Sequence, residues 1–195
     1  KGGYKHFMHK EIHEQPTVLG ETLKSFIDPQ NKILNVKIKR LSEQVKRITL
    51  IACGTSSYAC RVARYWFEEY SSIPVNVDIA SEYRYRNIFN SDGELVIFVS
   101  QSGETRDTIA SLEEAKKNGI NTLAIVNVID STIARIADES IITLAGPEIG
   151  VASTKAFTTQ LLTLFIIAVL LGKNKKLITK NKKIKIIDQL IEIPS

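Results

Sequence analysis

Hydroxyl side chains are concentrated directly after one apolar run of the sequence. The stretch SQSGETRDT, residues 100–108, contains four hydroxyl residues and one glycine and follows the run ELVIFV. Such side chains donate hydrogen bonds to a phosphate dianion, and the start of a helix adds free N–H groups and a partial positive charge. Because the stretch contains no lysine, this chemistry suits a monophosphate better than a nucleoside triphosphate.

A second apolar run ends in the same way. CGTSS, residues 53–57, follows ITLIA, and a third segment, GVASTK at 150–155, leads into a long apolar stretch. Ligands of open α/β sheets collect where strands end, so these are the segments in which a binding site is expected. A Ser or Thr at either of the first two turns could instead be a helix N-cap, worth about 1 kcal/mol. Two adjacent turns that are both this rich in hydroxyls favour a bound anion over simple capping.

Nucleotide-binding and serine-hydrolase motifs are excluded by spacing. No G-x-x-x-x-G-K-[ST] motif is present, and ACGTSS has one glycine where a dinucleotide site needs G-x-G-x-x-G. A serine-hydrolase elbow needs glycine on both sides of its nucleophile, whereas Ser102 has Ser100 and Glu104 at those places. All three histidines lie within the first thirteen residues, which gives neither a zinc ligand set nor a partner for a serine nucleophile.

Five further side chains near the expected strand ends could take part in group or proton transfer. Cys53 lies between a strand and a helix, where a thiol can become a nucleophile, but no histidine accompanies it and a small packing residue is the simpler interpretation. Glu82, Glu104, Glu148 and Lys155 could each move a proton, or could each be a helix cap or an ion-pair partner. We assign no catalytic residue, no metal ligand and no cofactor, and expect a binding site more than a reaction centre.

An α/β fold must position these turns. Segments of helical spacing separate five short β-rich runs, which are Ile48–Ala52, Val75–Ile79, Leu95–Val99, Thr122–Asn127 and Ile141–Leu144. ITLIA and LVIFV are almost continuously apolar, as strands covered on both faces are. We therefore predict a doubly wound, Rossmann-like α/β domain with a five-stranded parallel sheet flanked by helices.

Further helices are expected before and after this pattern. Residues 1–16 show neither helical nor strand spacing and are interpreted as a linker arm, after which Pro16 starts a helix. A short helix is predicted over Val36–Arg47, a long buried helix over Ser153–Leu171, and a last amphipathic helix around residues 184–191.

Composition and charge indicate an ordinary folded domain. The hydrophobic fraction is 44% and the charged fraction 24%, close to globular averages. The net charge is +5, but seven lysines and no acid fall in residues 173–185, so the rest is slightly acidic. We interpret these lysines as a solvated face and not as a nucleic-acid site. Cys53 and Cys60 are expected to stay unpaired, as in the cytoplasm. The longest apolar run, residues 161–171, falls short of the roughly 20 residues that span a bilayer.

The order CGTSS, SQSGET and EIGVASTKAFTTQ on a five-strand α/β pattern resembles the sugar isomerase (SIS) domain family. With the N-terminal KGGYKHFMHKEIHEQP, these motifs are similar to the first of the two SIS domains in the glucosamine-6-phosphate synthase family, over essentially the whole chain. The resemblance implies a glutamine-dependent aminotransferase and isomerase that converts fructose 6-phosphate to glucosamine 6-phosphate, for amino-sugar synthesis. A homodimer is expected because SIS-like domains commonly pair through their helices.

The family's ligand contacts carry over to ten positions of this sequence. By resemblance, the phosphate would be held by Ser56, Ser100, Gln101, Ser102 and Thr105. By resemblance, the sugar would be lined by Cys53, Gly54, Thr55, Val151 and Ser153. Fructose 6-phosphate or glucosamine 6-phosphate is therefore the expected ligand, without nucleic acid, membrane or cofactor.

The family's catalytic groups lie in segments that this sequence does not match. The resemblance implies a linker arm at 1–16 from a glutaminase domain, a SIS domain at 17–172, and a lysine-rich linker and helix at 173–195 towards a second SIS domain. The 195 residues alone are therefore expected to bind sugar phosphate without catalysis. Two alternatives remain: a regulatory SIS module that senses a phosphosugar, for which no DNA-binding helix-turn-helix is found, and a stand-alone isomerase, which would need its own base.

Overall fold

A five-stranded parallel sheet forms the centre of the computed structural model, which describes residues 2–88 and 91–195. The strands lie in the order β4-β3-β5-β6-β7. Their bounds are Arg47–Ala52 for β3, Val75–Ile79 for β4, Glu94–Ser100 for β5, Asn121–Val126 for β6 and Glu139–Ile142 for β7. Each strand coincides, to within two residues at either end, with one of the predicted β-rich runs. The predicted doubly wound α/β fold is therefore confirmed.

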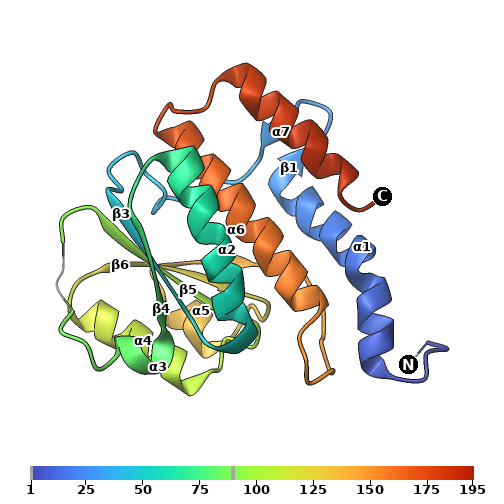
Figure 1. The fold of residues 1–195 in the computed structure, drawn as a ribbon, viewed down its shortest axis with the longest axis horizontal. Helices are drawn as coiled ribbons and strands as arrows, with labels where there is room; N and C mark the ends of the chain where they lie inside the picture. Colours follow the sequence, from blue (N-terminus) through green and yellow to red (C-terminus); the bar gives the residue numbers. More distant parts are fainter. Residues whose placement is uncertain (1, 89–90) are drawn as a thin grey trace.

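Helices cover both faces of the sheet (Figure 1). On one face lie α1, Phe7–Phe26; α2, Gly54–Ser71; α6, Lys155–Asn174; and α7, Lys180–Glu192. On the other face lie α3, Ala80–Tyr83; α4, Arg106–Lys117; and α5, Thr132–Ile136. Successive strand residues point to opposite faces, so Leu50 packs in the α6 layer and Ile51 in the α4 layer. Both strand faces are thus buried, as the continuous apolar runs predicted.

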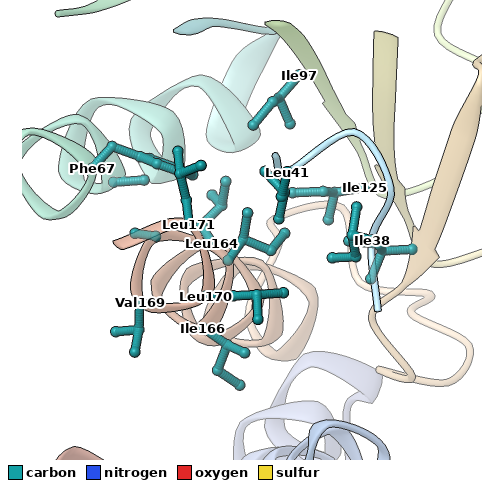
Figure 2. Close-up of a cluster of buried hydrophobic side chains, with 14 of the residues drawn as sticks. Ile38, Leu41, Phe67, Ile97, Ile125, Leu164, Ile166, Val169, Leu170 and Leu171 are labelled. Atoms are coloured by element: carbon teal, nitrogen blue, oxygen red, sulfur yellow. The ribbon is translucent and has the colours of Figure 1, made fainter. Parts of the chain in front are cut away.

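The α6 helix is the central element of the larger hydrophobic cluster. Figure 2 shows Leu164 and Leu171 of α6 on the side that faces Phe67 of α2 and the sheet, which carries Ile97 of β5. The 20-residue α6 is by length and composition able to cross a membrane, since its most apolar 18-residue window has a mean hydropathy of 1.8. However, 78% of its most apolar window is buried inside the domain. Its apolar surface is therefore used to cover the sheet.

The N-terminal segment differs from the sequence prediction. Instead of an irregular arm followed by a helix from Thr17, one continuous helix runs from Phe7 to Phe26, with Pro16 inside it; Lys1 of the predicted arm lies outside the described residues. Proline has no N–H to donate to the carbonyl four residues earlier. The side-chain amide of Gln15 donates to that carbonyl oxygen, on Ile12, at 3.0 Å. This substitute hydrogen bond reduces the cost of proline in mid-helix.

The predicted short helix over Val36–Arg47 is wrong. Strands β1, Ile27–Asp28, and β2, Ile33–Leu34, form a small antiparallel hairpin. The segment that follows consists of turns and irregular backbone up to the start of β3. Side chains elsewhere satisfy its backbone: the Glu139 carboxylate accepts two of its N–H groups, and Asn174 and Lys175 donate to three of its carbonyl oxygens. Its apolar residues Ile38 and Leu41 are buried beside α6 without forming the apolar stripe of a helix (Figure 2).

The two C-terminal helices lie close to the residue ranges predicted for them. The long buried helix begins at Lys155, two residues later than expected, and the amphipathic helix is α7. The hydroxyl of Thr179 caps α7 by accepting from the N–H of Lys182 at 3.2 Å. Ile187 and Leu190 of α7 are buried in the same cluster as the sheet residues. The segment after residue 172 therefore contributes to the core of the domain.

Two glycines inside helices provide a test of how closely the α2 and α6 layers pack. A methyl group on Gly172 of α6 would overlap the carbonyl oxygen of Tyr70 in α2, whereas a methyl group on Gly20 of α1 would meet nothing closer than 4.0 Å. Gly172→Ala is expected to lower the free energy of unfolding by about 1–3 kcal/mol through overpacking. Gly20→Ala, the control, should raise it by about 0.5–1 kcal/mol through helix propensity. Urea denaturation measures both; equal effects of the two changes would contradict the close α2–α6 packing.

Candidate phosphate-binding site

The two hydroxyl-rich turns lie side by side at the carboxyl edge of the sheet. Strands β3 and β5 are direct neighbours, with Ala52 opposite Val99. The chain goes from β3 to β4 on one side and from β5 to β6 and β7 on the other, so the strand order reverses between β3 and β5. Such a reversal opens a crevice outside the strand ends, where open α/β sheets bind ligands. The predicted position of the candidate site is thus matched by the topology.

Residues 53–57, here called the α2 turn, lead from β3 into α2. Gly54 has φ +55°, a left-handed conformation that glycine adopts without strain. A side chain at this position would meet nothing within 4 Å, so the space beside Gly54 is open. Cys53, Thr55 and Ser56 are half-buried around it. The α2 turn therefore presents the first N–H groups of an 18-residue helix to an open space.

Residues 100–105, here called the α4 turn, lead from β5 into α4. The buried Ser100 hydroxyl accepts a hydrogen bond from the N–H of Gly103 at 3.1 Å and lies 3.4 Å from the Thr105 hydroxyl. The Ser102 hydroxyl accepts from the N–H of Glu104 at 3.1 Å. Gln101 is half-buried between them. These bonds fold the turn on its own hydroxyls and bring the polar side chains together at the start of α4.

A side chain of α4 connects the two turns. The Thr108 hydroxyl is buried and lies 4.0 Å from the sulfur of Cys53. The sequence analysis assigned Thr108 no role in the site and missed this contact. The available signal was its position three residues after Thr105, which puts both on one face of α4. The contact shows that the start of α4 packs against the α2 turn.

The connection from β6 to α5 supports the α4 turn from the side away from β3. The N–H of Ile133 donates to the Gly103 carbonyl at 3.0 Å, and the N–H of Thr132 donates to the Glu104 carboxylate at 2.7 Å. The hydrogen bonds from Thr132 hold the pKa of the exposed Glu104 carboxyl below its ordinary value. Gly103 has φ +66°, and a side chain there would overlap Ser131. The Glu104 carboxylate thus caps the start of α5, which agrees with the helix-cap alternative to proton transfer.

The third candidate segment belongs to the connection between β7 and α6, residues 143–154, here called the α6 connection. Glu148 caps α6 by accepting from the N–H groups of Thr154 at 2.9 Å and Ala156 at 3.2 Å, and from the Ser153 hydroxyl at 3.0 Å. Val151 is fully exposed. Within the described part of the chain, no recorded hydrogen bond joins Val151 or Ser153 to the α2 or α4 turn. The start of α6 is occupied by a carboxylate and offers no anion site.

The remaining acid–base candidates and the second cysteine also have structural positions. Lys155 is buried and pairs with Glu14 of α1 at 2.8 Å, while Glu82 accepts a long contact of 3.4 Å from Ser81. Burial raises the pKa of the Cys60 thiol to about 12. Among residues 2–88 and 91–195, no three His, Cys, Asp or Glu side chains are placed to hold a metal ion. Of the side chains that the sequence singled out, those of the two turns remain as candidates for contact with a ligand.

Comparison with known proteins agrees with this geometry. The SIS domain model matches residues 42–170. Over its full length the chain is 50% identical to a glutamine–fructose-6-phosphate aminotransferase (isomerizing) of Bradyrhizobium diazoefficiens and 48% identical to one of Caldanaerobacter subterraneus, covering 32% of each. The chain therefore spans about a third of the length of these relatives.

A solved structure gives the same result. The C-terminal domain of glucosamine-fructose-6-phosphate aminotransferase from Francisella tularensis superposes with a TM-score of 0.94 and 43% identity, over 100% of this chain and 55% of that one. The SIS model alone covers well over half of the sequence, including both turns and most of α6. On these grounds the chain belongs to the SIS domain family.

Proposed function

We propose that this chain is the sugar-phosphate-binding SIS domain of a glucosamine-6-phosphate synthase, an enzyme that makes glucosamine 6-phosphate from fructose 6-phosphate and glutamine. The observation that carries the proposal is the pairing of two hydroxyl-rich turns at the reversal of strand order, connected through Thr108 and Cys53. Over its whole length this chain is 50% identical to a glutamine–fructose-6-phosphate aminotransferase (isomerizing), which supports the choice of enzyme.

Phosphate binding is assigned to the side chains that surround the starts of α2 and α4. In this proposal the phosphate accepts hydrogen bonds from the side chains of Ser56, Ser100, Gln101, Ser102 and Thr105. The first N–H groups of both helices add donors and a partial positive charge without any lysine. Asp107, which also lies in the first turn of α4, pairs with Arg84 at 3.4 Å, which reduces its repulsion of an anion.

The sugar is assigned to the open side of the same turns. In this proposal the sugar lies against Cys53 and Thr55, on the side where a methyl group on Gly54 would meet nothing within 4 Å. Val151 and Ser153 of the α6 connection complete this part of the proposed site. Because they have no recorded contact with the turns, their role depends on how the α6 connection is held.

Catalysis is assigned to parts of the enzyme outside these 195 residues. We propose a glutaminase domain before the arm at 1–16 and a second SIS domain after residues 173–195, with residues 17–172 as the SIS domain itself. The parent enzyme would be a cytoplasmic homodimer. Since Ile186, Ile187 and Leu190 of α7 are buried in the core of this domain, the segment 173–195 also stabilises it.

The phosphate assignment is tested by calorimetry with fructose 6-phosphate, glucosamine 6-phosphate and inorganic phosphate. Ser102→Ala combined with Thr105→Ala removes two proposed donors, and each hydrogen bond to a charged group contributes about 1.5–3 kcal/mol. The double variant should bind all three ligands at least about tenfold more weakly than the wild type. Thr17→Ala with Ser25→Ala removes two exposed hydroxyls from α1 and is the matched control. Unchanged affinity in the first variant would remove the α4 turn from the phosphate site.

The sugar assignment is tested by cysteine modification. Iodoacetamide should modify the half-buried Cys53 and spare Cys60, because Cys60 is fully buried and its thiol has a pKa of about 12. Saturating fructose 6-phosphate should slow modification of Cys53, because the sugar would cover it. Peptide mapping by mass spectrometry measures both sites in one sample. If the rate at Cys53 is the same with and without ligand, the sugar does not lie against this residue.

The assignment of catalysis to other segments is tested by an activity assay. With fructose 6-phosphate and ammonia, the 195-residue chain should form no glucosamine 6-phosphate above the rate of a heat-denatured control. Ammonia replaces glutamine, so the assay does not depend on a glutaminase. Product formation by the purified chain would refute the proposed separation of binding from catalysis.

A further inference from the structure

The first helix holds the α6 connection through a buried carboxylate. Glu11 of α1 is only 3% exposed, although it is charged and lies in the segment interpreted from sequence as a linker. One of its oxygens accepts from the N–H of Ile149 at 2.6 Å and from that of Gly150 at 3.1 Å. The other oxygen lies 3.2 Å from the same Gly150 nitrogen. Figure 1 shows the α6 connection beside the first turns of α1.

The shape of this contact requires a small residue at position 150. A Cβ atom on Gly150 would lie 2.6 Å from the Glu11 carboxylate and 3.5 Å from the Cβ of Met8. Near the same place, Glu14 pairs with the buried Lys155, and the hydrogen bond from Lys155 holds the pKa of the Glu14 carboxyl below its ordinary value. Two acids one turn apart on α1 thus contact the middle of the α6 connection and the first residue of α6.

The rest of the α6 connection is fixed by other groups. Its beginning is held by Asn127, whose side chain accepts from the N–H of Ala145 at 2.8 Å and donates to the Gly146 carbonyl at 2.7 Å. The N–H of Asn127 donates to the Gln101 carbonyl at 3.1 Å, which places this beginning next to the α4 turn. Between these supports, Ile149 is 61% exposed and Val151 is fully exposed, so packing contributes little there. Glu11 therefore provides the main restraint on the middle of the connection.

We propose that Glu11 is a positioning residue for sugar recognition. Its carboxylate fixes the backbone at Ile149 and Gly150 so that Val151 and Ser153 face the sugar, while the phosphate is bound by turns that Glu11 does not touch. This inference rests on the proposed function, because it assigns the sugar end of the same ligand to the α6 connection. It follows that Glu11 affects the affinity for the sugar and leaves the affinity for the phosphate group unchanged.

The experiment compares the dissociation constants of fructose 6-phosphate and inorganic phosphate by calorimetry. The wild-type chain should bind fructose 6-phosphate more tightly than inorganic phosphate. Glu11→Ala should weaken fructose 6-phosphate binding by about tenfold, the effect of losing one well-placed hydrogen bond, and change inorganic phosphate binding by less than about twofold. Gly150→Ala should have the same selective effect, because its methyl group displaces the carboxylate without removing it. This second variant tests the contact even if Glu11→Ala does not fold.

Two further variants separate positioning from general stability. Glu21→Ala removes an exposed carboxylate of the same helix, paired only with Lys24 among the recorded ion pairs, and should leave both affinities unchanged. Glu11→Gln keeps an oxygen that can accept from both N–H groups and should restore most of the sugar preference. Amide hydrogen exchange at Ile149 and Gly150 should be faster in Glu11→Ala and Gly150→Ala than in the wild type and in Glu21→Ala.

The outcomes distinguish failure of the proposed function from failure of the inference about Glu11. If the wild type binds neither ligand, the proposed function fails. If it binds both equally, or if Glu11→Ala weakens both equally, Glu11 has no specific role for the sugar and the inference is overturned. Unchanged fructose 6-phosphate binding in both Glu11→Ala and Gly150→Ala, with faster amide exchange at Ile149 and Gly150, would also overturn it. Only a loss confined to the sugar phosphate supports the positioning role.

Discussion

Residues Arg47–Ala52 of β3 pair in parallel with Glu94–Val99 of β5, while β4 pairs with the opposite side of β3. This arrangement makes the two connections leave β3 and β5 in opposite directions, one towards α2 and the other towards α4. The α2 and α4 turns are therefore neighbours although their residues lie 43 to 52 positions apart in the sequence. Had β4 been inserted between β3 and β5, the same hydroxyl residues would lie two strands apart, about 10 Å, and could not share one phosphate.

A site built from hydroxyls and backbone N–H groups depends on geometry more than on net charge. A lysine tolerates displacement because its charge acts over several ångströms, whereas a hydrogen bond weakens within a few tenths. The structure supports the α4 turn accordingly. From inside the turn, the Ser100 hydroxyl accepts from Gly103. From outside, Ile133 donates to Gly103 and Thr132 donates to Glu104. The glycine at 103 allows Ser131 to approach closely, which keeps this support in place.

The strands were predictable because burial on both faces leaves nearly continuous apolar runs, as in ITLIA and LVIFV. The turns followed from their position at the ends of those runs. Contacts between distant segments could not be predicted in this way. The sequence around Glu11 gives no sign that its carboxylate meets Gly150, 139 residues away. Pro16 was interpreted as a helix start because the Gln15 side chain that replaces its missing N–H is a local compensation that periodicity does not detect.

The order of elements along the chain has a consequence for biosynthesis. The α6 helix is the most apolar long segment of the domain, and in isolation its surface would bind other hydrophobic chains or a membrane. All five strands of the parallel sheet precede α6 in the sequence. The chain is synthesised from its N-terminus, and a domain generally folds as a unit once it has emerged from the ribosome. The surface that receives α6 is thus synthesised before α6 itself, which shortens the time during which this helix is exposed to chaperones and to aggregation.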